Sequence, residues 1–120
     1  MDGGKCRRGN KRLDVSGDDD FRIEFGYPDP DGKQCRMSLR DISQAGVSFV
    51  LNQELPNVEI GQMIDRAVVH LGKRKLNGDL VIAHLSDHRV EGTVCGALLY
   101  PSTDNDLIKL KSTVADLLTA

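Results

Sequence analysis

The sequence predicts a mainly all-β domain, an antiparallel barrel or sandwich closed by one C-terminal helix. Apolar side chains alternate with polar ones in several short runs, and turn-forming residues separate these runs. Such alternation is typical of strands that are buried on one face. Near the C-terminus the apolar spacing changes to three or four positions, which indicates a helix. The length of 120 residues is that of one domain with a single core.

The first 20 residues show almost no apolar periodicity, so we interpret them as a flexible basic arm that precedes a barrel domain over residues 21–120. Residues 1–12 contain five basic residues and one acidic residue, whereas the rest of the chain contains 11 basic and 17 acidic residues. A short basic arm on an acidic body favours a clamp for one small anion over a broad nucleic-acid surface. Only three Phe and two Tyr are available to stack on bases, so no DNA or RNA partner is expected.

A β-hairpin is expected at the start of the barrel. Residues 21–27 alternate apolar and polar side chains, and the alternation resumes at Cys35 on the return strand. Residues 28–32 form the turn, where the pair Asp31-Gly32 suits a hairpin because glycine tolerates a positive φ.

Four further strands follow, each bounded by turn or loop residues. They are expected over residues 47–51, 63–71, 80–85 and 90–99. We interpret the polar segments 72–79 and 86–89 as the turns that separate the last three strands. Strands at this spacing, joined by short turns, favour an antiparallel barrel or sandwich over βαβ units.

The closing helix is expected over about residues 103–119 and should pack on the barrel. Its apolar residues recur at helical spacing and are Leu107, Leu110, Val114, Leu117 and Leu118. Thr103 and Asp106 have the spacing of a capping box, in which side chains satisfy free N–H groups of the first turn.

Two short motifs carry the chemistry. Arg8 and Arg12 form R-x-x-x-R in the arm, and Asp41, Ser43 and Gly46 form D-x-S-x-x-G between the second and third predicted strands. With 28 residues and a predicted hairpin between Arg12 and Asp41, the chain resembles a PilZ domain over nearly its whole length. The resemblance implies a bacterial six-stranded antiparallel β-barrel with a C-terminal α-helix, whose usual ligand is the second messenger cyclic di-GMP (c-di-GMP).

The arginines of the arm suit that ligand. Cyclic di-GMP presents two phosphates and two guanines. A guanidinium group can form bidentate hydrogen bonds with phosphate oxygens, bind the O6 and N7 edge of guanine, or stack on the base. Arg8 and Arg12 are therefore expected to bind it, and binding is expected to order residues 5–14. Arg7 precedes the motif, and this resembles the PilZ arrangement that accepts two mutually intercalated ligand molecules in one site.

The second motif is expected to give selectivity for guanine. The Asp41 carboxylate can accept the N1 and N2 hydrogens of guanine, and the Ser43 hydroxyl can reach a phosphate or the base. Gly46 leaves room for a close backbone approach or a positive φ. The resemblance assigns ligand binding to all three residues. Taken alone, D-x-S-x-x-G is more often an ordinary turn with side-chain-to-backbone hydrogen bonds.

Other chemistry is not expected. Cys6, Cys35 and Cys95 are too widely spaced for a disulfide framework, and the last two are expected to be small core residues. His84 and His88 lie four positions apart near a predicted strand end, where this spacing does not share a face, so no metal site is expected. Because no serine is paired by motif with a histidine and no P-loop is present, we expect neither enzymatic activity nor a cofactor.

The predicted function is that of a second-messenger receptor that relays c-di-GMP, through ordering of the arm, to an unidentified partner protein or domain. No apolar run approaches the ~20 residues of a membrane span. The N-terminus also lacks the apolar stretch of a secretion signal, so a cytoplasmic protein is expected. The alternative is a PilZ-like interaction adaptor whose output does not need the nucleotide. A split-barrel enzyme would instead carry a bound flavin.

Overall fold

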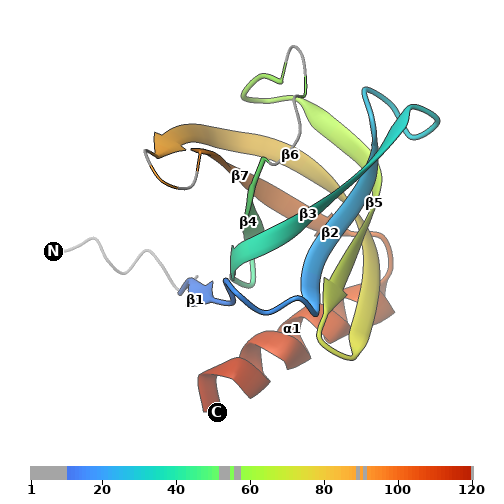
Figure 1. Cartoon of the computed structure of the whole chain (residues 1–120). Coiled ribbons are helices and arrows are strands. Elements are labelled where there is room, and N and C mark those ends of the chain that lie inside the picture. The colour runs from blue at the N-terminus through green and yellow to red at the C-terminus, as the bar shows by residue number, and fades with distance from the viewer. Residues whose placement is uncertain (1–10, 52–54, 56–57, 89, 91, 120) are drawn as a thin grey trace, which may run out of the picture.

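The computed structural model of the chain describes residues 11–51, 55, 58–88, 90 and 92–119. Figure 1 shows a barrel of strands with a helix at one end. The strands are β1 (Leu13–Asp14), β2 (Phe21–Tyr27), β3 (Lys33–Ile42), β4 (Gly46–Val50), β5 (Met63–Leu71), β6 (Arg74–His88) and β7 (Gly92–Pro101), and the helix is α1 (Asp104–Thr119).

The strands close into a ring in which every pairing is antiparallel. The order is β3-β2-β5-β6-β7-β4, and β4 returns to pair with β3. The two-residue strand β1 adds to the end of β3. The closure confirms the predicted six-stranded antiparallel barrel with a C-terminal helix and excludes a sandwich, because a sandwich consists of two separate sheets.

The inward faces of the strands fill the barrel. The rings of Phe25 and Phe49 pack at its centre with a centroid separation of 6.1 Å. Cys35 and Cys95 are fully buried among the apolar side chains, which confirms the prediction of two small core residues. Burial raises the pKa of the Cys95 thiol to about 12, so the thiol stays protonated at neutral pH.

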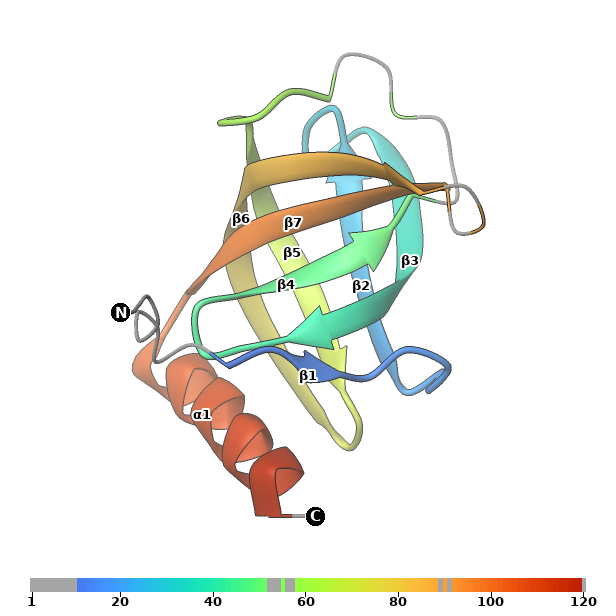
Figure 2. The same ribbon diagram turned by 90° about the vertical axis from the view of Figure 1, so that its left-hand side faces the viewer.

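Helix α1 lies across one end of the barrel (Figures 1 and 2) and buries Leu110 and Val114. At its start the Thr103 hydroxyl donates to Asp106 Oδ2 at 2.8 Å, and the Asp106 N–H donates to Thr103 Oγ1 at 3.1 Å. These two bonds confirm the predicted cap. Of the described residues, none lies in a helix long and apolar enough to cross a membrane.

The prediction of a turn over residues 72–79 was wrong, because β6 begins at Arg74 and leaves only Gly72 and Lys73 outside the strands. Leu71 pairs directly with Arg74, and Gly72 has a φ of +68°. The polar residues of this segment are typical of a turn, so the sequence did not predict a strand here. Leu76 is nevertheless fully buried on the inner face of the strand.

The prediction of a turn over residues 86–89 was also wrong for its first part. Strand β6 continues through Ser86 and Asp87 to His88, which pairs with Gly92 of β7. The polar side chains of such a strand end can face solvent, so composition alone did not mark it as a strand.

The predicted hairpin β2–β3 is confirmed, but the expected reason for its glycine was wrong. Tyr27 pairs with Lys33, so the loop comprises residues 28–32. Gly32 does not have a positive φ. A Cβ at this position would lie 2.4 Å from the Tyr27 carbonyl oxygen, so glycine is required by a close backbone contact.

Strand β1 was not predicted, because two residues are too few to show a periodicity. It pairs Leu13 with Ile42 and Asp14 with Asp41. The next residue, Val15, is buried, and its N–H donates to the Arg40 carbonyl at 3.0 Å. From residue 13 the segment that precedes β2 therefore lies against the barrel.

Candidate functional site

The D-x-S-x-x-G motif forms the turn between β3 and β4. The buried Ser43 Oγ accepts hydrogen bonds from the Ala45 N–H at 3.1 Å and the Gly46 N–H at 3.2 Å. The Ser43 N–H donates to the Gly46 carbonyl at 2.9 Å. Ser43 therefore holds the turn in shape, and its hydroxyl faces the backbone of the turn in this structure.

Gly46 is fixed by the neighbouring strand. It pairs with Leu98 of β7, and a Cβ would lie 2.1 Å from the Ala97 carbonyl oxygen. Its φ is not positive, so of the two expected reasons for glycine the close backbone approach is the one present. Any larger residue would push β4 away from β7 beside the motif.

The structure brings one residue of each motif together. Arg12 Nη1 lies 2.8 Å from Asp41 Oδ1, in an ion pair where the arginine side chain is 53% exposed and the aspartate side chain 19%. Arg12 directly precedes β1, which lies beside the end of β3 that carries Asp41 (Figure 2). Arg7 and Arg8 lie outside the described residues.

The same point of the sheet carries a second carboxylate, that of Asp14, which pairs with Asp41 in the β1–β3 register. Hydrogen bonds from the side chain and backbone of Ser16 lower the pKa of Asp14. Two carboxylates therefore lie next to each other here, and Arg12 neutralises that of Asp41.

The strand register aligns further residues with Asp41 across the outer strands. Asp41 pairs with Ser48 of β4, Ser48 with Gly96 of β7, and Gly96 with His84 of β6. These residues are separated in the sequence and share no motif. Only the pairing of the strands places them in one row beside Asp41.

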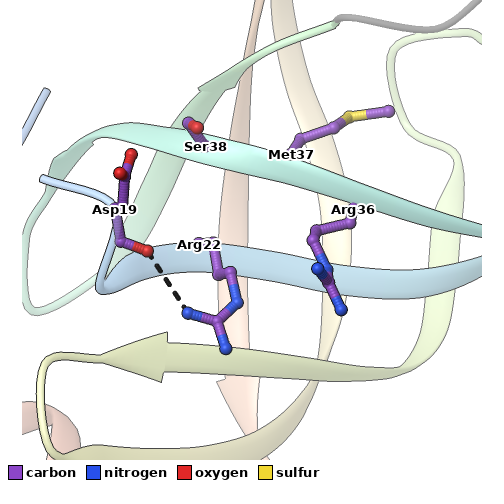
Figure 3. A pocket seen from close by; sticks show the side chains of 5 residues that line it. All are labelled: Asp19, Arg22, Arg36, Met37 and Ser38. Carbon is purple, nitrogen blue, oxygen red and sulfur yellow. Dashed lines mark hydrogen bonds between the residues drawn. The ribbon is translucent and has the colours of Figure 1, made fainter. Parts of the chain in front are cut away.

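A separate cavity of about 300 Å³ lies over β2 and β3 (Figure 3). Its lining residues are Asp19, Arg22, Arg36, Met37 and Ser38. Arg22 donates to the Asp19 carbonyl at 3.2 Å, and Arg36 donates to Glu24 at 2.8 Å. A hydrogen bond from His70 lowers the pKa of Glu24 and keeps it charged beside both arginines. None of the predicted site residues lines this cavity.

Comparison with known proteins gives no match to a family model and none to a curated protein sequence. Solved structures do match. MrkH of K. pneumonia in complex with c-di-GMP has a TM-score of 0.77 and 18% identity, over 94% of this chain and 52% of MrkH. The PilZ domain of E. coli YcgR with c-di-GMP has a TM-score of 0.68 and 16% identity, over 94% of this chain and 92% of that domain. This chain has the PilZ fold.

The PilZ fold is also present in MotI, an inhibitor of motility from Bacillus subtilis, which matches with a TM-score of 0.74 and 17% identity over 94% of this chain. The chain spans about half the length of MrkH and MotI, 52% in each case, and nearly all of the YcgR PilZ domain. Within the PilZ fold of this chain, the ion pair between Arg12 and Asp41 marks the meeting point of its two motifs.

Proposed function

We propose that this chain is a bacterial c-di-GMP receptor module that acts in the cytoplasm. The observation that carries the proposal is the 2.8 Å pair between Arg12 and Asp41, which joins an arginine of the arm to the carboxylate of the barrel motif. Two motifs that are remote in sequence thus have one member each at the same point of the surface. The ligand binds there, between the arm and the β3–β4 turn.

The chemistry of the two partners fits the two parts of the ligand. When Asp41 leaves Arg12, its carboxylate accepts the N1 and N2 hydrogens of a guanine. Arg12 and Arg8 then form bidentate hydrogen bonds with phosphate oxygens, and Arg7 contacts a second, intercalated ligand molecule. Gly46 contributes indirectly, because it lets β4 lie against β7 and so fixes the turn that carries Asp41. A direct ligand contact by Ser43 requires its hydroxyl to turn away from the Ala45 and Gly46 N–H groups.

The names of the structural neighbours support the same ligand class. The MrkH complex and the YcgR domain both contain c-di-GMP, and both share the fold of this chain. Fold alone does not fix a ligand, so the argument depends on the residues at the motif positions. No step of the proposal needs bond cleavage, and the module acts by binding rather than by catalysis.

The output of the module passes to a partner protein or domain. Three exposed apolar side chains on the outside of the barrel support a contact of this kind, namely Met63, Leu98 and Tyr100, which are 41–55% exposed. Met63 and Leu98 both pair with Val81, so they lie in one row across three strands. The same observation favours the second candidate, an interaction adaptor whose output does not need the nucleotide.

Calorimetric titration of the purified chain separates the two candidates. The ligands are c-di-GMP, GMP and cyclic AMP, added to the same protein preparation. A receptor binds c-di-GMP with saturation and binds the two mononucleotides far more weakly, and the fitted stoichiometry gives the number of ligand molecules per site. Absence of any heat of binding with c-di-GMP would leave the adaptor as the better description.

A further inference from the structure

A further pocket, of about 390 Å³, lies between helix α1 and the turn that joins β5 to β6. Figures 1 and 2 both show this turn beside the helix. The pocket shares no residue with the pair of Arg12 and Asp41. An apolar cavity of ~150 Å³ holds one benzene ring, so this pocket has room for about two side chains.

The inner side of the pocket is apolar. Phe21 and Leu71 are buried there, and Leu117 of α1 packs partly buried against the core. Gly72 brings no side chain to the pocket, and a Cβ at its position would lie 3.8 Å from the Phe21 ring. Its φ of +68° also favours glycine. An apolar group that enters here leaves water, which favours binding in proportion to the area buried.

Arg74 fixes one wall of the pocket by linking β6 to α1. Its Nη1 donates to Thr113 Oγ1 at 3.2 Å and lies 2.9 Å from Asp116 Oδ2. The positive charge of Arg74 is therefore balanced by Asp116. Among the described residues that line the pocket, Asp116 carries the one carboxylate.

The turn at the mouth of the pocket carries positive charge that no described carboxylate balances. Lys73, Arg74 and Lys75 are consecutive, and within the described part of the chain only Arg74 of these three forms an ion pair. Lys73 is exposed and lines the pocket. A cation beside an apolar surface complements a segment in which acidic and apolar residues are neighbours.

We propose that this pocket docks a short segment of a partner protein, in which apolar side chains are flanked by acidic residues. The apolar side chains lie against Phe21, Leu71 and Leu117, and an acidic residue of the segment pairs with Lys73. The size of the pocket limits the apolar part to about two side chains. Docking does not need the nucleotide, because Arg12 and Asp41 take no part in it.

Selection from a library of random peptides on the purified full chain tests the chemistry of the occupant. The enriched peptides should combine apolar residues with Asp or Glu. Replacement of the apolar residues of an enriched peptide by serine should weaken binding roughly tenfold or more, the value of burying one large apolar side chain. In NMR, the peptide should shift the amide signals of Gly72, Lys73 and Thr113. Enriched peptides without acidic residues, or shifts confined to other surfaces, would overturn the proposal.

Two charge variants should change the affinity for such a peptide in opposite directions. Lys73→Glu should weaken binding roughly threefold or more, and Asp116→Asn should strengthen it roughly two- to fivefold, because exposed charge interactions have this size. Lys111→Glu is the matched control, at an exposed lysine of α1 outside the pocket lining, and should leave the affinity unchanged. Melting temperatures should stay close to that of the parent in all three. Parental affinity in Lys73→Glu would show that the proposed ion pair does not form.

A membrane surface is the other partner that apolar and basic groups can bind. Co-sedimentation with vesicles of phosphatidylglycerol tests it, and the chain should stay in the supernatant. Binding to these vesicles that is lost in Lys73→Glu would assign the pocket to lipid and overturn the proposal. All these measurements are made without c-di-GMP. Failure to bind c-di-GMP would therefore contradict the proposed function alone, whereas failure of the peptide tests would contradict only the docking pocket.

Discussion

Arg12 Nη1 lies 2.8 Å from Asp41 Oδ1, although the two residues are 29 positions apart in the chain. Each belongs to a different motif, and each is expected to contact the ligand. A ligand that uses the Asp41 carboxylate for guanine must therefore replace this ion pair. The Arg12 guanidinium and the Asp41 carboxylate, which now bind each other, would each bind the ligand instead.

Replacement of Arg12 by alanine should weaken ligand binding without unfolding the domain. The pair with Asp41 is exposed, and such pairs contribute only about 0–1 kcal/mol to stability. A charge-assisted contact to the ligand is worth ~1.5 to 3 kcal/mol, so we expect roughly ten- to a hundredfold weaker binding in calorimetry. Arg36→Ala is the control, since Arg36 is also exposed and paired with a carboxylate, that of Glu24. Unchanged affinity in Arg12→Ala would contradict the site.

Replacement of Asp41 by alanine should reduce selectivity as well as affinity. Without the carboxylate, the N1 and N2 hydrogens of guanine lose their acceptor, at a cost of ~1 to 3 kcal/mol. The measurement compares the affinities for c-di-GMP and cyclic di-AMP in the parent and in the variant. The ratio of the two should fall towards one in Asp41→Ala. A variant that kept the full ratio would show that another residue recognises the base.

Gly46→Ala should be strongly destabilising. The new Cβ would lie 2.1 Å from the Ala97 carbonyl oxygen, and neither backbone can move without breaking the β4–β7 pairing. We expect a loss of roughly 3 kcal/mol in the free energy of unfolding, measured by urea denaturation, which is large for one substitution. A variant with parental stability would mean that the two strands separate easily at this point.

Amide hydrogen exchange tests the ordering of the arm. The Val15 N–H already donates to Arg40 in this structure, so its exchange should be slow with or without ligand. The amides of residues 5–12 should gain protection when c-di-GMP is added, while those of β2 and β4 change little. A chain that lacks residues 1–12 should keep its melting transition and lose binding. Protection of residues 5–12 before ligand is added would exclude an order–disorder switch.

Acid should destabilise the domain through Asp106. Burial alone would raise the pKa of Asp106, but hydrogen bonds from Thr103 and Asn77 and the charge of Lys109 lower it below its ordinary value. A carboxylate of this kind stabilises the fold above the unfolded pKa of about 3.9 and loses that contribution as pH falls through its folded pKa. Urea unfolding at several pH values should show a weaker acid dependence in Asp106→Asn than in the parent. Asp104→Asn, at an exposed residue in the same turn, is the control.

The sequence predicted the fold best where buried apolar residues recur along most of a strand. Strands β2 and β5 have the predicted bounds. Buried residues alternate along β2, and in β5 the alternation resumes at Ala67 after a register shift that follows Ile64. Strand β6 begins earlier and ends later than predicted. Its polar outer residues resemble a turn, and only its pairing with β5 and β7 fixes its ends.

The contact between the two motifs was predictable from the sequence, whereas the row of residues beside Asp41 was not. Arg12 and Asp41 were expected to act together, and the structure places them in contact. Ser48, Gly96 and His84 lie on three different strands, and no short pattern connects them. Their alignment depends on which strands are neighbours and on where each pairing begins, which are properties of the whole ring.

The closed ring also limits how another polypeptide can recognise this domain. In the order of the described strands, β1 alone has a neighbour on only one side. Recognition by addition of a strand needs free backbone N–H and C=O groups at a sheet edge. Among the described strands, the segment that directly follows Arg12 is therefore the place where a second chain can extend the sheet.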